Sequence, residues 1–401
     1  MMKGIRLKKL FGYFNYTIEF ASKGMVILTG PNGFGKSTII KCIDAISNSD
    51  LNFFFELDFE EIEILKNNDN ENLLIKKEKG DLFINGKHVD RRVVVYARRV
   101  QMRRYELVEE EPGMAEMMEN YSYALEYMQK AVGKVIYIKE QRLLREAIST
   151  RSTRSEVERR RLDNQIIHVV QSIPEKLLFQ IRKNSTEYSK VANELDSTYP
   201  ERLFHQTEGI EKEDFDKRIA IMHEKVEKLN KYGISNINKP QNIEFKKEDA
   251  RALKIYFEDF DKKYCEYEEL IEKLELFTDM VNRRYRFKVV KVSNSCGVEV
   301  IDEKGKSLDL LKLSSGEQET MVLFYRLLFE VPDDVMLLVD EPEISLHIAW
   351  QRMFAQDLEL ISKKKNLSAI IATHSPQIVN GNRDIQVDLG EMYKDGLNQR
   401  K

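Results

Sequence analysis

The stretch Gly30-Pro31-Asn32-Gly33-Phe34-Gly35-Lys36-Ser37 decides what kind of domain this chain forms. It fits the pattern G-x-x-x-x-G-K-[ST], follows the apolar run Met25–Thr29 and precedes a predicted helix over 37–47. Backbone N–H groups of such a loop surround phosphates, Lys36 brings a positive charge to the β and γ phosphates, and Ser37 can bind Mg²⁺. The sequence therefore predicts an α/β domain with a nucleotide site formed by Gly30, Pro31, Asn32, Gly33, Phe34, Gly35, Lys36, Ser37 and Thr38.

A second motif lies far downstream, where the apolar run Met336–Val339 ends in Asp340 and Glu341. Asp340 is predicted to hold Mg²⁺ directly or through water, and Glu341 to orient the attacking water or accept its proton. Two acids at the end of an apolar strand are common by themselves. In a chain that also has a phosphate-binding loop, they predict a hydrolytic site.

A third motif is the segment Leu313–Gln318, which contains Ser314, Ser315, Gly316 and Glu317 at the start of a predicted helix. Serine hydroxyls and free N–H groups at a helix N-terminus form an anion site, which predicts a contact with nucleotide phosphates. The alternative is an ordinary N-cap, in which a serine and an acid three residues later satisfy the first turn of the helix.

Two single residues complete the candidate site. His374 directly follows the predicted strand Ala369–Ala372 and could hydrogen-bond a γ-phosphate, although a histidine satisfied within a core or loop is the alternative. A predicted strand that begins at Val135 ends in Gln141, which could bind Mg²⁺ and sense the γ-phosphate, although a glutamine at a strand end is commonplace.

Strand-like segments with turns give way in the middle of the chain to charged and apolar residues at helical spacing. This change divides the chain into an α/β head and a helical insertion. We predict a head in two parts, 1–145 and 285–401, separated by an insertion over 146–284 that forms antiparallel helices or a short coiled coil. The predicted helix breaks lie near Pro174, near Pro200 and at 233–240. The further predicted strands are Ile5–Leu10, Tyr16–Phe20, Val93–Tyr96, Phe287–Val292, Val298–Ile301 and Ser307–Leu311.

The composition argues against several classes of protein. The 401 residues are 33% charged with a formal net charge of -3, so no overall basic character indicates nucleic acid. The three cysteines are far apart and contain no C-x-x-C, which argues against a disulfide framework or a structural zinc site. We expect a reduced, cytoplasmic protein that does not enter a membrane, since neither a signal core nor a membrane-spanning run is present.

Local basic sets could still contact DNA or a partner protein. The alternative is a solvated helix face with salt bridges, because acids such as Glu156 and Glu158 are interspersed. The arginines concerned are Arg91, Arg92, Arg98, Arg99, Arg103, Arg104, Arg142, Arg145, Arg151, Arg154, Arg159, Arg160 and Arg161.

Taken in order, these motifs resemble the ABC-type ATPase superfamily over about 1–145 and 285–401. Gly30–Ser37 resemble Walker A, Gln141 the Q-loop, 313–318 the signature, 335–341 Walker B, and His374 the switch histidine. The signature reads Leu-Ser-Ser-Gly-Glu-Gln, which is more typical of the RecF, SMC and OLD-like branch than of transporters. The stretch 341–347 resembles soluble OLD-like ATPases, many of them subunits of bacterial anti-phage systems such as AriA of PARIS and PtuA of Septu.

This resemblance implies ATP and Mg²⁺ as ligands and ATP hydrolysis as the activity. It further implies that two heads pair, each signature covering the nucleotide of the other, in a homodimer or higher homo-oligomer. The role it favours is a sensor or scaffold subunit of an anti-phage complex that controls a nuclease or toxin from a neighbouring gene. The alternatives are a RecF- or SMC-like DNA-binding ATPase and a transporter ATPase, the latter disfavoured by the signature and the insertion. We do not expect the Toprim nuclease of OLD proteins, because too few residues follow His374.

Overall fold

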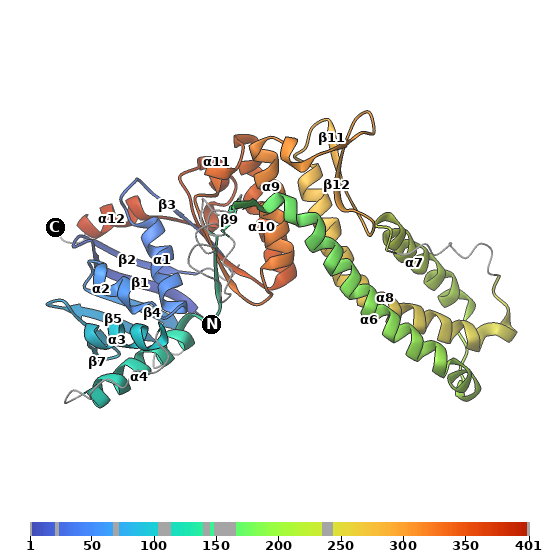
Figure 1. The fold of residues 1–401 in the computed structure, drawn as a ribbon, viewed down its shortest axis with the longest axis horizontal. Helices are drawn as coiled ribbons and strands as arrows, with labels where there is room; N and C mark the ends of the chain where they lie inside the picture. The colour runs from blue at the N-terminus through green and yellow to red at the C-terminus, as the bar shows by residue number, and fades with distance from the viewer. Residues whose placement is uncertain are drawn as a thin grey trace, which may run out of the picture. The chain divides into compact units, whose positions relative to one another are not determined.

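The computed structural model describes residues 2–20, 24–66, 72–102, 114–138, 145–147, 166–234 and 244–398. The chain forms two compact units: the first comprises Met1–Arg142 with Val331–Lys401, and the second comprises Leu143–Glu330 (Figure 1). The predicted insertion, 146–284, lies inside the second unit, which also contains residues 285–330.

A parallel sheet forms the centre of the first unit. Its five strands, in spatial order, are β16 (Gln386–Asp388), β3 (Met25–Thr29), β15 (Ser368–Ala372), β14 (Met336–Asp340) and β8 (Val135–Ile138). All five residues of β3 are buried, as the continuous apolar run predicts. Because the strands are parallel, the segments that follow β3, β14 and β15 meet at one edge of the sheet.

An antiparallel sheet shares the core of the first unit. Its strands, in spatial order, are β2 (Phe14–Glu19), β1 (Met2–Leu10), β4 (Glu61–Lys66), β5 (Leu73–Glu78), β6 (Asp81–Ile84) and β7 (Lys87–Val89). The helices of this unit are α1 (Lys36–Ser47), α2 (Leu51–Glu56), α3 (Arg91–Met102), α4 (Met114–Val132), α10 (Ile348–Lys365), α11 (Pro376–Val379) and α12 (Leu389–Asn398), with short 3₁₀ turns at Pro342–Ser345 and Arg383–Ile385. Buried residues of α1 and of both sheets form one hydrophobic cluster.

The strand predicted at Val93–Tyr96 is wrong, because these residues lie in α3. Asp90 starts this helix: its carboxylate accepts from the N–H of Arg92 at 2.7 Å, and its carbonyl accepts from the N–H groups of Val93 and Val94. A local cap of this kind outweighs the strand preference of three consecutive valines, which is weak and dependent on context.

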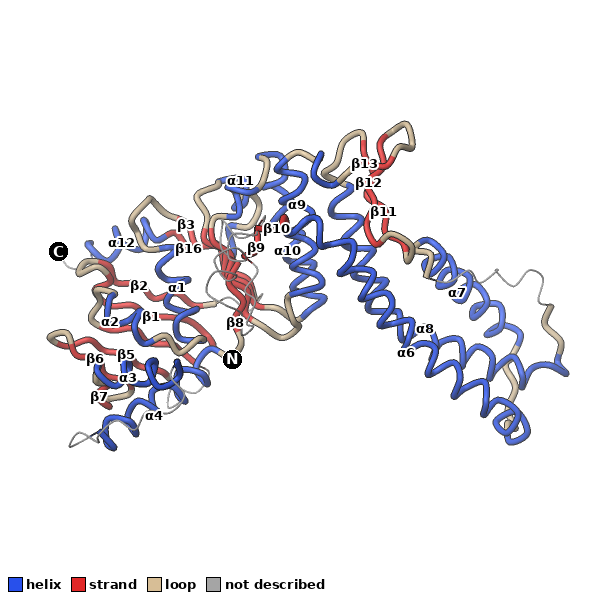
Figure 2. The backbone as a smooth tube through the Cα atoms, in the orientation of Figure 1, coloured by secondary structure: helices blue, strands red, loops and turns tan. Residues whose placement is uncertain are grey.

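Long helices dominate the second unit: α6 (Val169–His205), α7 (Lys212–Lys231) and α8 (Ala250–Asn282), shown in Figure 2. The helices α6 and α8 run antiparallel, since Asn184 donates to the carbonyl of Glu266 while Asp196 pairs with Lys263. The helix α7 packs on α8 through a small apolar cluster that consists of Phe215, Met222, Val226 and Phe257.

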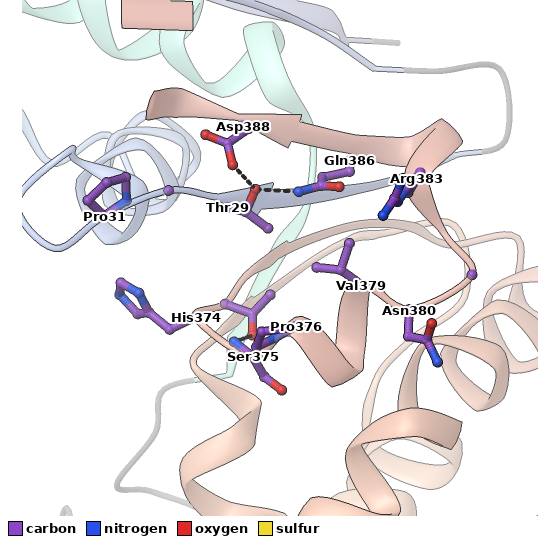
Figure 3. A pocket seen from close by; sticks show the side chains of 13 residues that line it. Thr29, Pro31, His374, Ser375, Pro376, Val379, Asn380, Arg383, Gln386 and Asp388 are labelled. Carbon is purple, nitrogen blue, oxygen red and sulfur yellow. Dashed lines mark hydrogen bonds between the residues drawn. The ribbon is translucent and has the colours of Figure 1, made fainter. Parts of the chain in front are cut away.

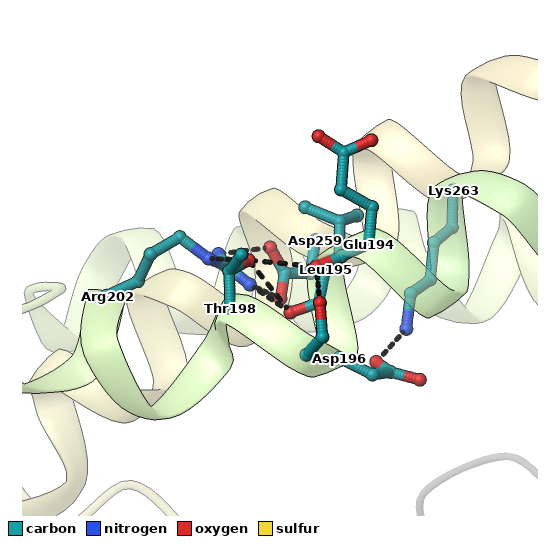
Figure 4. A network of polar contacts seen from close by, with 8 residues as sticks. Glu194, Leu195, Asp196, Thr198, Arg202, Asp259 and Lys263 are labelled. Carbon is teal, nitrogen blue, oxygen red and sulfur yellow. Dashed lines mark hydrogen bonds and ion pairs between the residues drawn. The ribbon is translucent and has the colours of Figure 1, made fainter.

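The breaks predicted at Pro174 and Pro200 are wrong, because both prolines lie inside α6. Near Pro200, the Arg202 guanidinium donates to the Leu195 carbonyl at 2.7 Å and to the two carboxylate oxygens of Asp259 at 2.6 and 2.7 Å (Figure 4). A proline within a helix costs about 3 kcal/mol. Packing against α8 and the hydrogen bonds from Arg202 to Asp259 of α8 offset that cost.

The rest of the second unit contains the predicted strands after residue 287. These are β11 (Lys288–Ser293), β12 (Gly297–Asp302) and β13 (Ser307–Leu308), which form one antiparallel sheet; β9 (Arg145–Ala147) and β10 (Ile166–His168) pair separately. The strand predicted over 307–311 ends early because the Asp309 carboxylate caps a 3₁₀ turn at Leu310–Lys312. Another 3₁₀ turn, Lys247–Asp249, precedes α8. The helix α9 (Ser315–Tyr325) continues as a π-helical turn, Arg326–Glu330. Among the described residues, no helix combines the length and apolarity that crossing a bilayer requires.

Candidate nucleotide site

The phosphate-binding loop has the backbone that its glycines predict. Gly30, Gly33 and Gly35 have φ angles of 138°, 83° and 90°, a region that residues with a Cβ rarely adopt. A Cβ on Gly33 would meet nothing within 4 Å, so this position requires glycine for its conformation and not for close packing. The helix α1 begins at Lys36, directly after this loop.

The Lys36 ammonium lies inside this loop, where it donates to the carbonyls of Gly30 and Pro31 at 2.8 and 3.2 Å. The residue is only 5% exposed, and burial lowers the pKa of its side chain, while the nearby Glu341 and Glu343 carboxylates act in the opposite direction. A buried cation next to free N–H groups at a helix start fits the phosphates of a nucleotide.

Ser37 and Asp340 meet although 303 positions separate them in the sequence. The Ser37 hydroxyl donates to Asp340 Oδ1 at 2.8 Å, and the Tyr137 hydroxyl donates to Asp340 Oδ2 at 2.9 Å. A serine hydroxyl and a carboxylate beside the phosphate loop are the oxygen ligands that Mg²⁺ uses together with nucleotide phosphates. The residues fit such an ion, and Tyr137, which the sequence did not single out, orients the carboxylate.

Glu341 and His374 lie next to each other at the same edge of the sheet. Their side chains, Oε1 and Nε2, are 3.8 Å apart, and His374 Nδ1 is 3.4 Å from the Lys36 ammonium. Glu341 has a left-handed backbone with φ 47°, which is unusual for a residue with a side chain and recurs at functional sites. An acid, an imidazole and a lysine thus lie next to one another beside the phosphate loop.

Glu343 and Gln351 also contact this region, and sequence reasoning did not assign them a role. The Glu343 carboxylate accepts from the Thr373 hydroxyl at 2.7 Å and from the His374 N–H at 2.5 Å. Gln351 accepts from the Ser375 hydroxyl at 2.6 Å. The spacing of Glu343 from Glu341 was visible in the sequence, but no local pattern connects it with residues 30 positions later.

A cavity of about 470 Å³ opens beside the phosphate loop (Figure 3). Its lining includes Pro31 and His374, so it adjoins the site described above. On another wall, the Thr29 hydroxyl donates to Asp388 Oδ2 at 3.1 Å and accepts from the Gln386 amide at 2.8 Å, which ties β3 to β16.

Aromatic side chains support the loop from the antiparallel sheet. The Tyr16 hydroxyl donates to the carbonyl of Phe34 at 3.0 Å. The Phe34 ring centroid lies 5.1 Å from that of Phe14 and 5.9 Å from that of Tyr393 on α12. These contacts fix the one bulky residue of the phosphate loop.

The signature-like segment belongs to the second unit and forms a complete capping box. Ser314 is the N-cap of α9: its N–H donates to Glu317 Oε2 at 2.9 Å, and its hydroxyl accepts from the Glu317 N–H. The Lys288 ammonium lies 2.8 Å from both carboxylate oxygens of Glu317, and Tyr285 donates to the carbonyl of Glu317. Although burial acts in the opposite direction, the Lys288 and Ser314 contacts lower the pKa of Glu317, whose carboxylate therefore organises the helix start.

Several predicted residues lie outside the described ranges. They include Gln141, Arg103, Arg104, Arg142, Arg151, Arg154, Arg159, Arg160 and Arg161. The backbones of Arg98 and Arg99 lie in α3, and Arg91 and Arg92 are exposed near its start.

Comparison with known proteins relates this arrangement to ATPases. A family model described as an AAA ATPase domain (AAA_15) matches residues 2–379. Among solved structures, the chain aligns with an SmcHead bound to the C-winged helix domain of ScpA, at 13% identity and a TM-score of 0.41 over 94% of this chain and 91% of that chain. Two other SMC head structures, from Pyrococcus furiosus (bound to the C-terminal domain of ScpA) and Thermotoga maritima, align over the same shares with 15% and 10% identity and TM-scores of 0.37 and 0.35. No curated protein matches the chain.

Proposed function

Because this chain belongs to the AAA ATPase domain family, we propose that it binds ATP with Mg²⁺ and hydrolyses it at the edge formed by β3, β14 and β15. The observation that carries the proposal is the contact between Ser37 and Asp340 at 2.8 Å, beside the buried ammonium of Lys36. It brings the two predicted metal ligands next to the phosphate loop.

Each residue has a separate task in this reaction. Lys36 and the loop N–H groups bind the β and γ phosphates, while Ser37 and Asp340 would hold Mg²⁺, which supplies charge neutralisation at the phosphates when bound. Glu341 accepts a proton from the attacking water or orients it. The Lys36 ammonium can only donate, so His374 Nδ1 accepts from it and the ring proton lies on Nε2. His374 therefore donates a hydrogen bond from Nε2 to the γ-phosphate.

We propose that the active assembly is a pair of heads, in which Ser314, Ser315 and Gly316 of one copy cover the nucleotide held by the other. The support is the position of these residues at the start of α9, because backbone N–H groups at a helix N-terminus attract phosphates. Glu317 organises this cap through Lys288 and Ser314 and acts on the nucleotide only through it.

The cellular role that we propose is a sensor or scaffold subunit that controls a separate effector in bacterial defence against phage. The support is the resemblance of 341–347 to OLD-like ATPases. Co-purification with the products of neighbouring genes, with and without ATP, tests this role. Capture of DNA in place of an effector protein would favour the RecF- or SMC-like alternative.

The ATPase proposal predicts that Lys36→Ala abolishes ATP binding and phosphate release, because the phosphates lose their buried cation. The matched control is Lys41→Ala on the exposed face of the same helix, which should retain wild-type turnover. Phosphate release at steady state and binding of a fluorescent ATP analogue measure both properties. Undiminished hydrolysis in Lys36→Ala would refute the site.

A further inference from the structure

The loop that carries His374 is held by a segment from another part of the chain. After β15, the Thr373 hydroxyl and the His374 N–H both donate to the Glu343 carboxylate, one to each oxygen. Thr373 is fully buried, and its hydroxyl oxygen also accepts from the N–H of Ser375. Glu343 therefore fixes both the backbone and a side chain of this loop.

Gln351, at the start of α10, makes a second connection between the same two segments. Its amide oxygen accepts from the Ser375 hydroxyl at 2.6 Å. Its amide nitrogen donates back to the carbonyls of Leu346 and Glu343 at 2.9 and 3.3 Å. The loop after β15 is thus bonded at three consecutive residues to the segment that follows Glu341.

The geometry of His374 depends on this arrangement. The imidazole is about one-third exposed, with a relative side-chain exposure of 35%, so packing alone does not hold it. Its contacts within the site are the 3.4 Å approach of Nδ1 to Lys36 and the 3.8 Å approach of Nε2 to Glu341. If the loop were free, a small shift of the His374 backbone would carry the ring away from both partners.

We propose that Glu343, assisted by Gln351, is a positioning residue for His374 in ATP hydrolysis. This inference rests on the proposed function. Glu343 need not touch nucleotide: its carboxylate already accepts two hydrogen bonds from the loop, and its role is to keep Nε2 where a γ-phosphate oxygen arrives. Glu343 therefore acts through the hydrogen bonds that it accepts and not through its charge, and the bond from the His374 N–H is the one that positions the histidine.

Kinetics of Glu343→Gln and Glu343→Ala test this proposal. Gln keeps the acceptor for the His374 N–H and loses the acceptor for the Thr373 hydroxyl, so it should lower kcat by no more than about 3-fold, whereas Ala, which loses both acceptors, should lower kcat by about 10–100-fold with little change in KM. Glu359→Ala, which removes a surface partner of Lys363 on α10, is the control and should behave as wild type. Equal losses in the Gln and Ala variants would overturn the proposal in favour of a role of the charge.

Two further measurements separate positioning from a general structural effect. In a His374→Ala background, Glu343→Ala should lower kcat no further, because residues that act as a unit are not additive; additive losses would overturn the proposal. Hydrogen exchange of the His374 amide should accelerate in Glu343→Ala, and an unchanged rate would also overturn it. Because hydrogen exchange needs no turnover, it tests whether Glu343 holds the His374 loop even if the wild-type protein does not hydrolyse ATP. Failure to hydrolyse ATP would refute only the proposed function.

Discussion

Glu341 is the residue that we propose for proton transfer from the attacking water. Its N–H donates to the Ala372 carbonyl at 2.9 Å, and its left-handed backbone turns the side chain toward His374. A glutamine at this position has the same shape but cannot accept a proton, so the substitution tests hydrolysis of ATP separately from binding of ATP.

We expect Glu341→Gln to retain ATP binding and to lose at least about 100-fold in kcat, within the range that general bases contribute. Equilibrium binding of ATP and single-turnover hydrolysis measure the two effects. Glu303→Gln, in an exposed turn of the second unit, is the control and should not change either. Hydrolysis at the wild-type rate in Glu341→Gln would mean that another group handles the water.

At the scale of elements, the pairing of α6 with α8 depends on polar contacts as well as on apolar packing. The Arg202–Asp259 pair is bidentate, and the Asp259 side chain is only 9% exposed. Removing one partner of such a pair leaves the other charge without compensation.

We expect Asp259→Ala to destabilise the second unit by about 1–3 kcal/mol, below the full value for a buried pair because Arg202 is partly exposed. The control is Glu187→Ala, which removes an exposed partner of Lys190 and should change stability by less than about 0.5 kcal/mol. Denaturant unfolding monitored by circular dichroism measures both. Equal effects of the two substitutions would show that the Arg202–Asp259 contact does not stabilise the helix pair.

For the whole molecule, the proposed pairing of heads requires an exposed surface close to Glu341. Ile344 and Ile348, on the segment that Glu343 and Gln351 anchor, are 56% and 63% exposed. If ATP changes the ratio of paired to unpaired heads from 1:99 to 99:1, it must favour the paired state by about 5.5 kcal/mol. Pairing can bury only the exposed part of these two side chains, which is worth roughly 2–3.5 kcal/mol in total, so losing that burial would remove a large part of the difference.

We expect the double substitution Ile344→Asp and Ile348→Asp, made together with Glu341→Gln, to prevent the ATP-dependent dimer that Glu341→Gln alone should accumulate. Light scattering with and without ATP measures the mass. Leu360→Asp, at an exposed position farther along α10, is the matched control and should still dimerise. A dimer that survives the double substitution would exclude this face from the interface.

Features that depend on neighbouring residues could be predicted from the sequence. The phosphate loop, the continuous strand before it and the cap formed by Ser314 and Glu317 each involve residues within a few positions of one another. Hydrogen bonds and backbone preferences over such short distances are properties of the local sequence, so pattern reasoning identifies them. The same local reasoning failed at Val93–Tyr96, where the Asp90 cap competed with strand preference.

Only the tertiary structure decided which distant residues meet. It set Tyr137 against Asp340, Glu343 against the loop of His374, and Arg202 against Asp259 near the proline that should have ended α6. These contacts follow from the order of the strands and from the packing of the helices. Both depend on the burial of many apolar side chains from distant parts of the sequence. The sequence by itself therefore determined the chemistry that we propose for the nucleotide site, whereas the tertiary structure determined which side chains hold the residues of that site in place.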